Sequence, residues 1–304
     1  MSKIGIIGTI NRDSVRLADG TFRKGWGGIL YNIRTFSQLL GDDSIIIPAC
    51  KVGADCHGRI MAILNSLPQV RTDLIQKTPG KNNHCFLTYT DIGNKQEVLA
   101  GGVSPLKYTD VAPLQDCEMI LVNYISGRDI YTRSLQKLRR HYCGEIYIDI
   151  HSLTLGKRRD GSRFLRTPPA WWEVIAAGDF IQVNRLELVG LTGSVAAVKS
   201  DQNEIKKRAR RFFELLGERR INCDNKVLII TDGGRGCYLS YRGKMDMKFR
   251  HVPTLRTIAY GDTTGCGDCF SAGFIAGWLT SRTLVFAARE ANRAGQRRIL
   301  GTLG

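Results

Sequence analysis

The chain has 304 residues, of which 43% are hydrophobic, and its 44 Lys and Arg against 28 Asp and Glu give a formal net charge of +16. This composition excludes a disordered or collagen-like chain and supplies enough apolar residues for one large α/β domain. The apolar runs are much shorter than the roughly 20 residues of a membrane-spanning helix, and the first residues lack the layout of a signal peptide. We therefore expect a cytoplasmic protein with no membrane partner.

Short apolar runs that end near Gly, Asn or Asp alternate along the chain with segments of helical periodicity. The predicted strands are Lys3–Ile10, Ser44–Val52, Met119–Asn123, Glu145–Ile150 and Lys226–Thr231. The predicted helices are Asn32–Leu40, Arg59–Leu67, Tyr131–His141, Asn203–Leu216 and Thr283–Leu300. Strands that alternate with helices predict an α/β fold whose mainly parallel sheet is covered on both faces.

Two stretches interrupt this alternation, and both have the pattern of a β-hairpin. Residues 14–26 contain Asp19-Gly20 between two short extended segments, and residues 84–102 contain HCFLTYT, a turn around Gly93, and KQEVLA. Antiparallel hairpins within a parallel pattern predict a small sheet that stands apart from the main one. Such a sheet could cover a cleft as a lid.

The excess of positive charge indicates an anionic partner, such as nucleic acid, a membrane surface or the phosphates of a nucleotide. The most basic segment is EIKKRARRFFELLG, residues 204–217, in which apolar residues recur at helical spacing and the cations occupy the other face. A solvated helix face is the favoured interpretation of this pattern, so nucleic acid is not an expected partner.

The chain contains nine cysteines, an odd number in a sequence without an export signal, so we do not expect disulfides to stabilise the fold. Cys266 and Cys269 form a CxxC sequence, which in thioredoxins is a redox motif. The location near the C-terminus is wrong for a thioredoxin fold, and redox catalysis is therefore disfavoured.

The segment Gly261–Asp268, GDTTGCGD, precedes the apolar sequence CFSAGFIAGWL, for which we predict a buried helix. Gly265, Cys266 and Gly267 would then lie at a helix N-terminus, where N–H groups and the helix dipole favour an anion. Asp268, in the first turn, is placed to accept a proton from a hydroxyl group beside a bound phosphate. This combination is what phosphoryl transfer to an alcohol requires, and a helix that is merely capped by Asp268 is the structural alternative.

This segment resembles the C-terminal signature of the ribokinase-like (PfkB-type) carbohydrate and nucleoside kinases. Other motifs of the family have counterparts in the same order, and the resemblance extends over residues 3–304. These counterparts are Asn11-Arg-Asp13, Gly27-Gly-Ile-Leu-Tyr-Asn32, Lys51-Val-Gly-Ala-Asp55, Asn184-Arg-Leu-Glu187 and Thr231-Asp-Gly-Gly-Arg-Gly236.

The residues themselves suit the roles that the resemblance implies. Asn11 and Asp13 follow the first predicted strand, at the edge where open α/β sheets bind ligands, and their side chains can bind sugar hydroxyls. Gly27 and Gly28 permit a close approach of the backbone to a ligand, and Asn32, one helical turn later, can point back at it. A turn residue at Asp13 and a simple helix start at the glycines are the structural alternatives.

The resemblance implies a single ribokinase-like domain over residues 1–304, a three-layer α/β/α sandwich with a β-lid formed by about 14–26 and 84–102. It implies ATP and Mg²⁺ as cofactors and a possible K⁺ ion. Asp268 would be the base, and Gly265, Cys266 and Gly267 would stabilise the transferring phosphoryl group. The acceptor would be held by Asn11, Asp13, Gly27, Gly28 and Asn32. The nucleotide would be bordered by Asn184, Thr231, Gly233 and Gly236. Glu187 would serve Mg²⁺, directly or through water, and Asp262 and Thr264 match positions linked to the monovalent cation.

We therefore expect an ATP-dependent kinase that transfers the γ-phosphoryl group to a hydroxymethyl group of a sugar or nucleoside. A sugar-phosphate kinase is the first alternative, since the net charge favours anionic ligands. A nucleotide- or nucleic-acid-binding module without turnover is the second. Because the lids of such kinases often pair two subunits, a homodimer through the lid is compatible with the sequence.

Overall fold

The structure is a computed structural model that describes residues 2–91, 94–193, 201–244, 246–255 and 263–303. Its centre is a nine-stranded sheet with the strand order β15-β14-β13-β12-β9-β8-β1-β4-β5. The strands are β1 Lys3–Ile7, β4 Ile45–Gly53, β5 Ile75–Thr78, β8 Met119–Asn123, β9 Glu145–Asp149, β12 Phe180–Asn184, β13 Val227–Thr231, β14 Cys237–Arg242 and β15 Met247–Val252. The pairs from β5 to β13 are parallel, and the pairs β13–β14 and β14–β15 are antiparallel.

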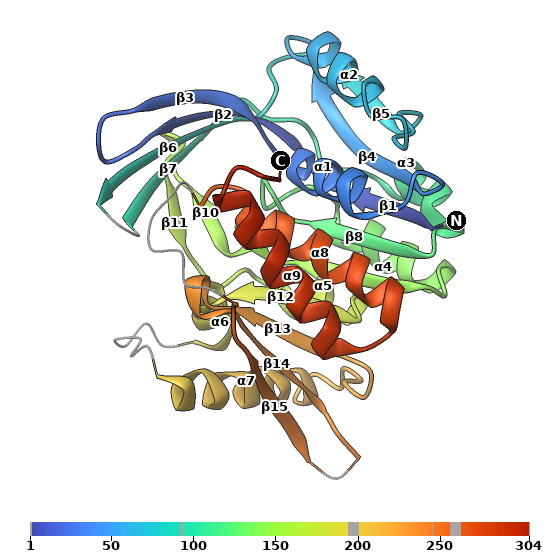
Figure 1. Cartoon of the computed structure of the whole chain (residues 1–304), viewed down its shortest axis with the longest axis vertical. Helices are drawn as coiled ribbons and strands as arrows, with labels where there is room; N and C mark the ends of the chain where they lie inside the picture. Colours follow the sequence, from blue (N-terminus) through green and yellow to red (C-terminus); the bar gives the residue numbers. More distant parts are fainter. Residues whose placement is uncertain (1, 92–93, 194–200, 245, 256–262, 304) are drawn as a thin grey trace.

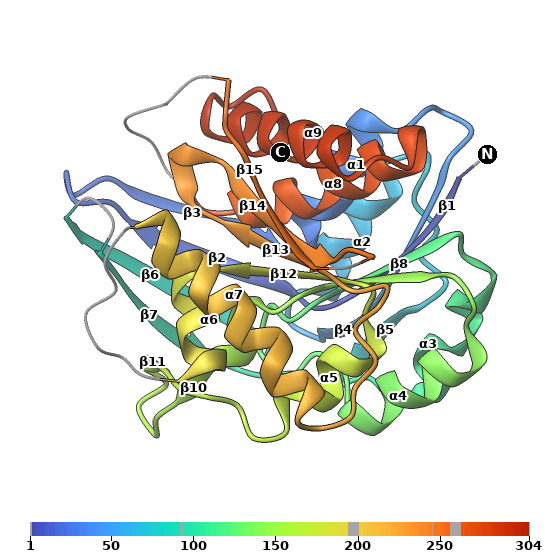
Figure 2. The same ribbon diagram turned by 90° about the horizontal axis from the view of Figure 1, so that it is seen from below.

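Helices cover both faces of this sheet and give the predicted three-layer α/β/α sandwich, which is seen edge-on in Figure 2. One face packs against α1 Ile29–Leu39, α2 His57–Asn65, α8 Cys266–Ser281 and α9 Leu284–Ile299. The other packs against α3 Tyr108–Val111, α4 Thr132–His141, α5 Trp171–Ala177, α6 Arg185–Thr192 and α7 Gln202–Gly217. The fold class predicted from the sequence is confirmed.

The alternation of buried and polar residues explains the helices that the sequence predicts. In α7, Ile205, Ala209, Phe212 and Leu216 are buried and the cations lie on the opposite side, as the pattern indicates. α8 differs because ten of its residues are buried, so it lies within the core between the sheet and α9. None of the helices in the described part of the chain is both long and apolar enough to cross a membrane.

The two predicted hairpins are present and join into one four-stranded sheet of order β3-β2-β6-β7. Its strands are β2 Ile10–Arg16, β3 Phe22–Gly28, β6 His84–Asp91 and β7 Asn94–Ala100, and β2 and β6 pair in parallel. Figure 1 shows this sheet standing off the main one, and its own core consists of Val15, Cys85, Leu87 and Leu99.

A further hairpin, β10 Leu155–Lys157 and β11 Arg163–Leu165, was not predicted from the sequence. It lies against the outer strand of the small sheet, where the Leu99 N–H donates to the Gly161 carbonyl at 2.9 Å. The side chain of Arg163 also donates to the Ser126 carbonyl at 3.1 Å. The hairpin therefore connects the small sheet to the loops at the edge of the main sheet.

Candidate functional site

Polar side chains gather where the central parallel strands end. Asn123, Asp149, Asn184 and Thr231 are the last residues of β8, β9, β12 and β13, and they pair in register as Asn123 with Asp149 and Asn184 with Thr231. The carboxyl ends of parallel strands meet at one edge of a sheet, which is where α/β folds bind ligands. The structure thus places the chemistry of the chain at that edge.

The N-terminus of α8 lies at this edge, as the GDTTGCGD sequence predicts. Gly265 precedes the helix with a φ of 83°, Cys266 is its first residue, and Gly267 and Asp268 follow in the first turn. The side-chain amide of Gln182 on β12 donates both to the Gly267 carbonyl at 3.2 Å and to Asp149 Oδ2 at 2.8 Å. This amide therefore ties the start of α8 to the ends of β9 and β12.

Asp268 is buried and is bonded to two asparagines, one at its carboxylate and one at its main-chain carbonyl. The Nδ2 group of Asn123 donates to Asp268 Oδ1 at 2.8 Å and to Asn32 Oδ1 at 3.0 Å. Asn32 Nδ2 in turn donates to the Asp268 main-chain carbonyl at 2.7 Å and to Ser271 Oγ at 2.9 Å. The hydrogen bond from the fully buried Asn123 therefore fixes the direction of the Asp268 carboxylate.

For Asn32 this network is a correction to the sequence-based expectation that it points at an acceptor. Both polar atoms of its side-chain amide, Nδ2 and Oδ1, form hydrogen bonds within the protein, and the side chain is completely buried. Its contacts join α1 to α8 instead. Asn11 and Asp13 also lie elsewhere than expected, because they belong to β2 of the small sheet and not to the end of β1.

The two glycines of the predicted acceptor loop are required by the packing around them. A Cβ atom on Gly27 would lie 1.9 Å from Asp13 Oδ2, and one on Gly28, whose φ is 66°, would lie 2.2 Å from the Thr9 carbonyl oxygen. Asn11, which accepts a hydrogen bond from Thr9 Oγ1 at 3.3 Å, and Asp13 are both buried. The structure therefore brings together Asn11, Asp13, Gly27 and Gly28 at the junction of β2, β3 and α1.

Tyr31 lies between this junction and the start of α8. Its ring atoms would be only 2.7–2.8 Å from a Cβ atom on Gly265, and burial, followed by the negative charge of Asp13, raises the pKa of its hydroxyl to about 12. The guanidinium group of Arg298 lies over the ring, 4.9 Å from its centre. Tyr31 is thus an uncharged aromatic residue that lies between the acceptor residues and Asp268.

The predicted nucleotide-binding residues lie on the other side of Asp268. Asn184 caps α6 and donates two hydrogen bonds to the carboxylate of Glu187. Its main-chain N–H donates to Oε2 at 2.8 Å, and its side-chain Nδ2 donates to Oε1 at 2.6 Å. Glu187 is 9% exposed, so it lies within the protein and not on a solvated helix face. Gly233 and Gly236 follow Thr231 with φ values of 55° and 100°, in a turn that Asp232 closes through Arg235 at 2.8 Å.

Three carboxylates converge between these two sides. Burial raises the pKa of Asp149 well above its usual range, and the negative charges of Glu187 and Asp268 raise it further. Such a set of hard oxygen donors fits Mg²⁺, which Asp149 and Glu187 would hold. Among the proposed cation ligands, Asp262 lies outside the described residues, and Thr264 is 3.2 Å from the hydroxyl of Tyr89 on β6.

The raised pKa of Asp149 leads to a prediction about stability. The folded protein retains this proton to a higher pH than the unfolded chain, so the unfolding free energy falls as the pH rises from about 4 toward the folded-state pKa. We expect Asp149→Asn to remove this dependence and to raise the melting temperature at pH 7 in EDTA by about 2–4 °C for each ~1 kcal/mol relieved. Thermal unfolding of both proteins across pH 4–8 measures the effect, and a lower melting temperature for the variant would contradict it.

Cys269, the second cysteine of the CxxC sequence, is part of the protein interior. Cys269 is fully buried, it receives a hydrogen bond from Thr35 Oγ1 at 3.2 Å, and burial raises the pKa of its thiol to about 11. A thiol with that pKa is protonated at neutral pH and is a poor nucleophile. Cys269 therefore serves the packing of α8 against α1.

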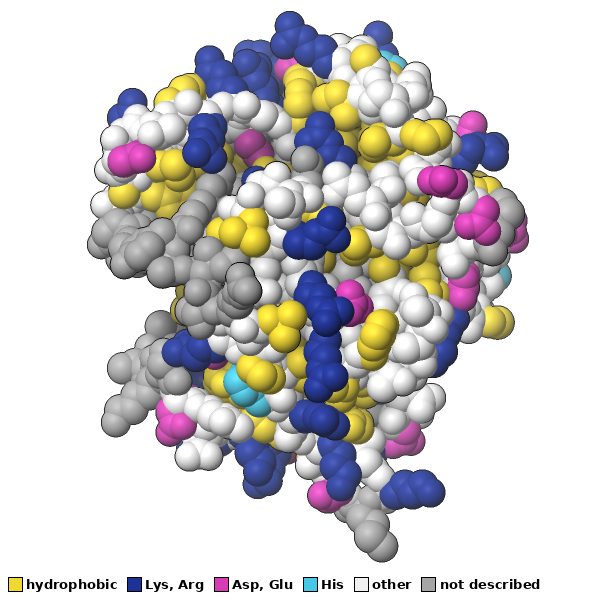
Figure 3. All heavy atoms as spheres, in the orientation of Figure 1, with side chains coloured by type: hydrophobic (Ala, Val, Ile, Leu, Met, Phe, Trp, Pro, Cys, Tyr) yellow, Lys and Arg dark blue, Asp and Glu magenta, His cyan; other side chains and the backbone are white. Residues whose placement is uncertain are grey.

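The excess positive charge lies largely on the outer surface. On α9 the arginines 289, 293 and 297 are exposed, as are Lys248 and Arg250 on β15, and Figure 3 shows Lys and Arg side chains spread along this face.

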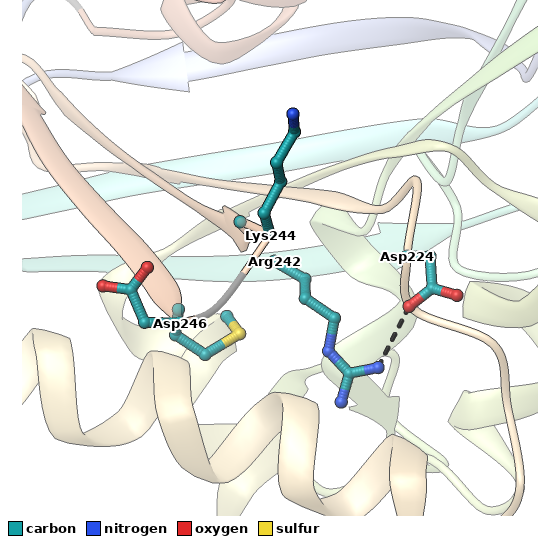
Figure 4. A pocket seen from close by; sticks show the side chains of 6 residues that line it. Asp224, Arg242, Lys244 and Asp246 are labelled. Carbon is teal, nitrogen blue, oxygen red and sulfur yellow. Dashed lines mark hydrogen bonds and ion pairs between the residues drawn. The ribbon is translucent and has the colours of Figure 1, made fainter.

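A separate hollow beside the β14–β15 turn is lined by Asp224, Arg242, Gly243, Lys244, Asp246 and Met247. Figure 4 shows Arg242 paired with Asp224 there at 3.0 Å, while Lys244 points away. Tyr241, the residue before Arg242, pairs with Val227 at the start of β13, so this hollow is at the opposite edge of the sheet from Asp268.

The sequence analysis missed Asn123, Asp149, Gln182 and Tyr31. A signal existed for the first two, because each is a polar residue that directly ends a buried strand. Gln182 lies within a strand that we did not predict, and Tyr31 resembles an ordinary apolar helix residue. Contacts across more than 200 residues of sequence, such as Asn32 with Asp268, had no local signal.

Comparison with known proteins agrees with this geometry. The family model described as pfkB family carbohydrate kinase matches residues 1–301. Cytidine kinase from Thermococcus kodakarensis is 24% identical over 300 residues, which cover 93% of this chain and 91% of that protein.

Two solved structures share the fold across nearly the whole chain. A pyrophosphate-dependent kinase of the ribokinase family bound to sulfate has a TM-score of 0.76 at 17% identity, covering 98% of this chain and 95% of its own. Ribokinase from Arabidopsis thaliana with ribose and ATP has a TM-score of 0.73 at 16% identity, covering 99% and 93%.

The family match extends over the sheet, the small β-sheet and the α8 segment together, and the enzymes it describes are phosphotransferases that act on alcohol groups. With strand ends, helix N-terminus and buried carboxylate in one place, the chain belongs to the pfkB family of carbohydrate kinases.

Proposed function

We propose that this protein transfers the γ-phosphoryl group of ATP to a hydroxymethyl group of a free sugar or nucleoside, with Asp268 as the general base. The observation that carries the proposal is the position of the buried Asp268 carboxylate in the first turn of α8. The acceptor residues of β2 and β3 lie on one side of it and the residues after β12 and β13 on the other. The cytidine kinase and the ribokinase support an acceptor of this class.

The residues on the acceptor side of Asp268 position the acceptor before the phosphoryl group is transferred. Asp13 and Asn11 orient the hydroxyl groups of the acceptor, and Gly27 and Gly28 allow it to approach the backbone. Asn123 holds Asp268 so that its carboxylate can take the proton of the attacking hydroxyl as the new O–P bond forms. Asn32 acts as a positioning residue, since it fixes the main chain of Asp268 and orients Asn123.

The start of α8 acts on the transferring group. The N–H groups of Gly265 and Gly267 and the helix dipole stabilise its negative charge, which is an electrostatic contribution that needs no movement during transfer. The Cys266 N–H, which was expected to share this role, donates to the Thr263 carbonyl at 3.1 Å, so Cys266 contributes through the helix dipole. Mg²⁺ bound by Asp149 and Glu187 would neutralise charge on the phosphate chain. Asn184, Thr231, Gly233 and Gly236 border the nucleotide, and a K⁺ ion near Thr264 and Asp262 would add positive charge beside them.

The hydrogen bond between Tyr89 and Thr264 connects the small sheet to the segment before α8. We propose that it keeps the small sheet closed as a lid over the acceptor, so that water is excluded during transfer. Tyr89→Phe should therefore lower kcat/KM for the acceptor about 3–10-fold, the effect of one neutral hydrogen bond. Steady-state kinetics measures this change, with Tyr241→Phe on β14 as a matched control, and equal values for Tyr89→Phe and wild type would contradict it.

The first test of the function is donor consumption across a panel of free sugars, nucleosides and sugar phosphates, with ATP and with pyrophosphate as donor. Stimulation by a free sugar or nucleoside with ATP would support the proposal. Stimulation only by phosphorylated sugars would make the protein a sugar-phosphate kinase, and turnover only with pyrophosphate would refute ATP as donor. Salt-dependent nucleic-acid binding without any turnover would favour a binding module instead.

A further inference from the structure

Asp149, His151 and Asp268 bring three metal-binding side chains together, and the function proposed above gives no role to His151. Each offers one ligand atom, and these atoms all lie within 4.8 Å of one another. Asp149 ends β9, His151 begins the short 3₁₀ turn His151–Thr154 that follows, and Asp268 comes from α8. Within the described ranges this is the single cluster of His, Cys, Asp or Glu with such a spacing.

The surroundings of the cluster also point to a bound ion. Asn123 is completely buried, donates through Nδ2 to Asp268 at 2.8 Å, and is the neighbour of Asp149 across the sheet. Its Oδ1 atom has no hydrogen-bond partner among the residues that the structure describes. A buried oxygen without a donor is costly and is commonly explained by an ion or a water molecule that it contacts. Here that oxygen belongs to a side chain already bonded to one ligand and adjacent to another.

The donor set determines which ion fits. Mg²⁺ prefers oxygen ligands, whereas an imidazole nitrogen with two carboxylates suits borderline transition ions such as Zn²⁺. Zn²⁺ with three protein ligands and a water molecule would place those ligands about 3.3 Å apart, given bonds of about 2.0–2.1 Å. Small side-chain rotations would bring the present spacing to that value. Asp149 and Asp268 are almost fully buried and His151 is half-buried, so the ion could enter from the side of His151.

We propose that Asp149, His151 and Asp268 form a binding site for a Zn²⁺-type transition-metal ion, and that this ion inhibits the enzyme by coordinating the carboxylate of Asp268. A carboxylate oxygen that binds a metal ion is a much weaker proton acceptor, so the attacking hydroxyl would keep its proton. The inhibition depends on the proposed role of Asp268 as base. The binding itself does not depend on the proposed function.

The decisive variant is His151→Asn, with His141→Asn as its matched control. His151 has a φ of 37°, and Asn tolerates this left-handed conformation better than most residues, so the turn should be retained. His141 is exposed at the end of α4, before the start of β9, and the five residues of β9 separate it from the cluster by about 16 Å. The two variants remove the same functional group from the same chain.

The first measurement is calorimetric titration with Zn²⁺ in millimolar Mg²⁺, without nucleotide or acceptor. We expect wild type and His141→Asn to bind one Zn²⁺ per chain at this site, and His151→Asn to bind it at least 10-fold more weakly, as even the loss of a group that only orients a ligand can cost this much. Any Zn²⁺ that binds to cysteine side chains contributes equally to the titrations of all three proteins, because neither substitution changes a cysteine. His151→Asn with wild-type affinity and stoichiometry would overturn the site, as would wild-type affinity in Asp149→Asn.

The second measurement is the ratio of turnover with and without buffered free Zn²⁺, taken within each variant at fixed ATP and Mg²⁺. The ratio should fall below one-tenth for wild type and His141→Asn and stay near one for His151→Asn at the same Zn²⁺ concentration. Equal inhibition of all three would overturn the inhibitory role. If no acceptor supports turnover, the proposed function fails, while the titration still decides whether the metal site exists.

Discussion

Replacing Asp268 by Asn is expected to lower kcat by about 10²–10⁴-fold, the usual contribution of a positioned general base. The amide cannot take the proton of the attacking hydroxyl, although it has nearly the shape of the carboxylate. Its oxygen can still accept the hydrogen bond that Asn123 donates at 2.8 Å, so α8 should remain in place. KM for ATP and for the acceptor should change little, because the variant removes a group that acts mainly in the transition state.

Steady-state kinetics of Asp268→Asn with the best acceptor of the panel measures this loss, and circular dichroism confirms that the fold is retained. Asp129→Asn is a suitable control, because Asp129 is another buried aspartate whose pKa burial raises, to about 6, and it bonds to Ser126 and Gly127 in its own loop. A kcat for Asp268→Asn within a few-fold of wild type would remove Asp268 from the role of base.

Much of the fold could be predicted because its signals are local. Met119–Asn123 is a strand with the bounds that its apolar run predicts, and the turn residues near Asp19 and Asn94 indicate the two hairpins. What could not be predicted is how distant segments pair. The parallel pairing of β2 with β6 puts Arg12 beside His84, and neither strand carries a pattern that specifies the other.

The candidate site shows the same difference between features with a local sequence signal and features that depend on tertiary contacts. Asp268 and the glycines before it lie in one continuous motif, and the helix dipole gives that motif a chemical meaning without knowledge of the fold. Asn32 looked like a ligand-binding residue because it follows a glycine pair at one helical turn. Only the packing of α1 against α8 reveals that its amide bonds to the Asp268 carbonyl and to Ser271. Residue type and spacing identify which groups are chemically useful, and the tertiary contacts decide which of them face a ligand.

Gly265→Ala is expected to lower kcat/KM by about 10²–10³-fold, the range seen when one donor to a developing negative charge is lost. Gly265 has a φ of 83°, and an added Cβ atom would lie 2.7–2.8 Å from the ring of Tyr31. The ring cannot yield easily, because the Arg298 guanidinium lies over it. The start of α8 would therefore move, and its N–H groups would no longer point at the transferring phosphoryl group.

Gly20→Ala separates this displacement from the cost of the backbone conformation alone. Gly20 has a φ of 85° in an exposed turn, and a Cβ atom there would meet nothing within 4 Å. Both substitutions should cost about 1–2 kcal/mol of stability from the left-handed conformation, but only Gly265→Ala should reduce turnover. Adding Tyr31→Ala to Gly265→Ala tests the mechanism of the loss, since the smaller side chain removes the collision. If the glycine serves only as a flexible link, activity will be low in Gly265→Ala whether or not Tyr31 is truncated, whereas partial recovery in the double variant would show that the contact between ring and helix start sets the position of the anion site.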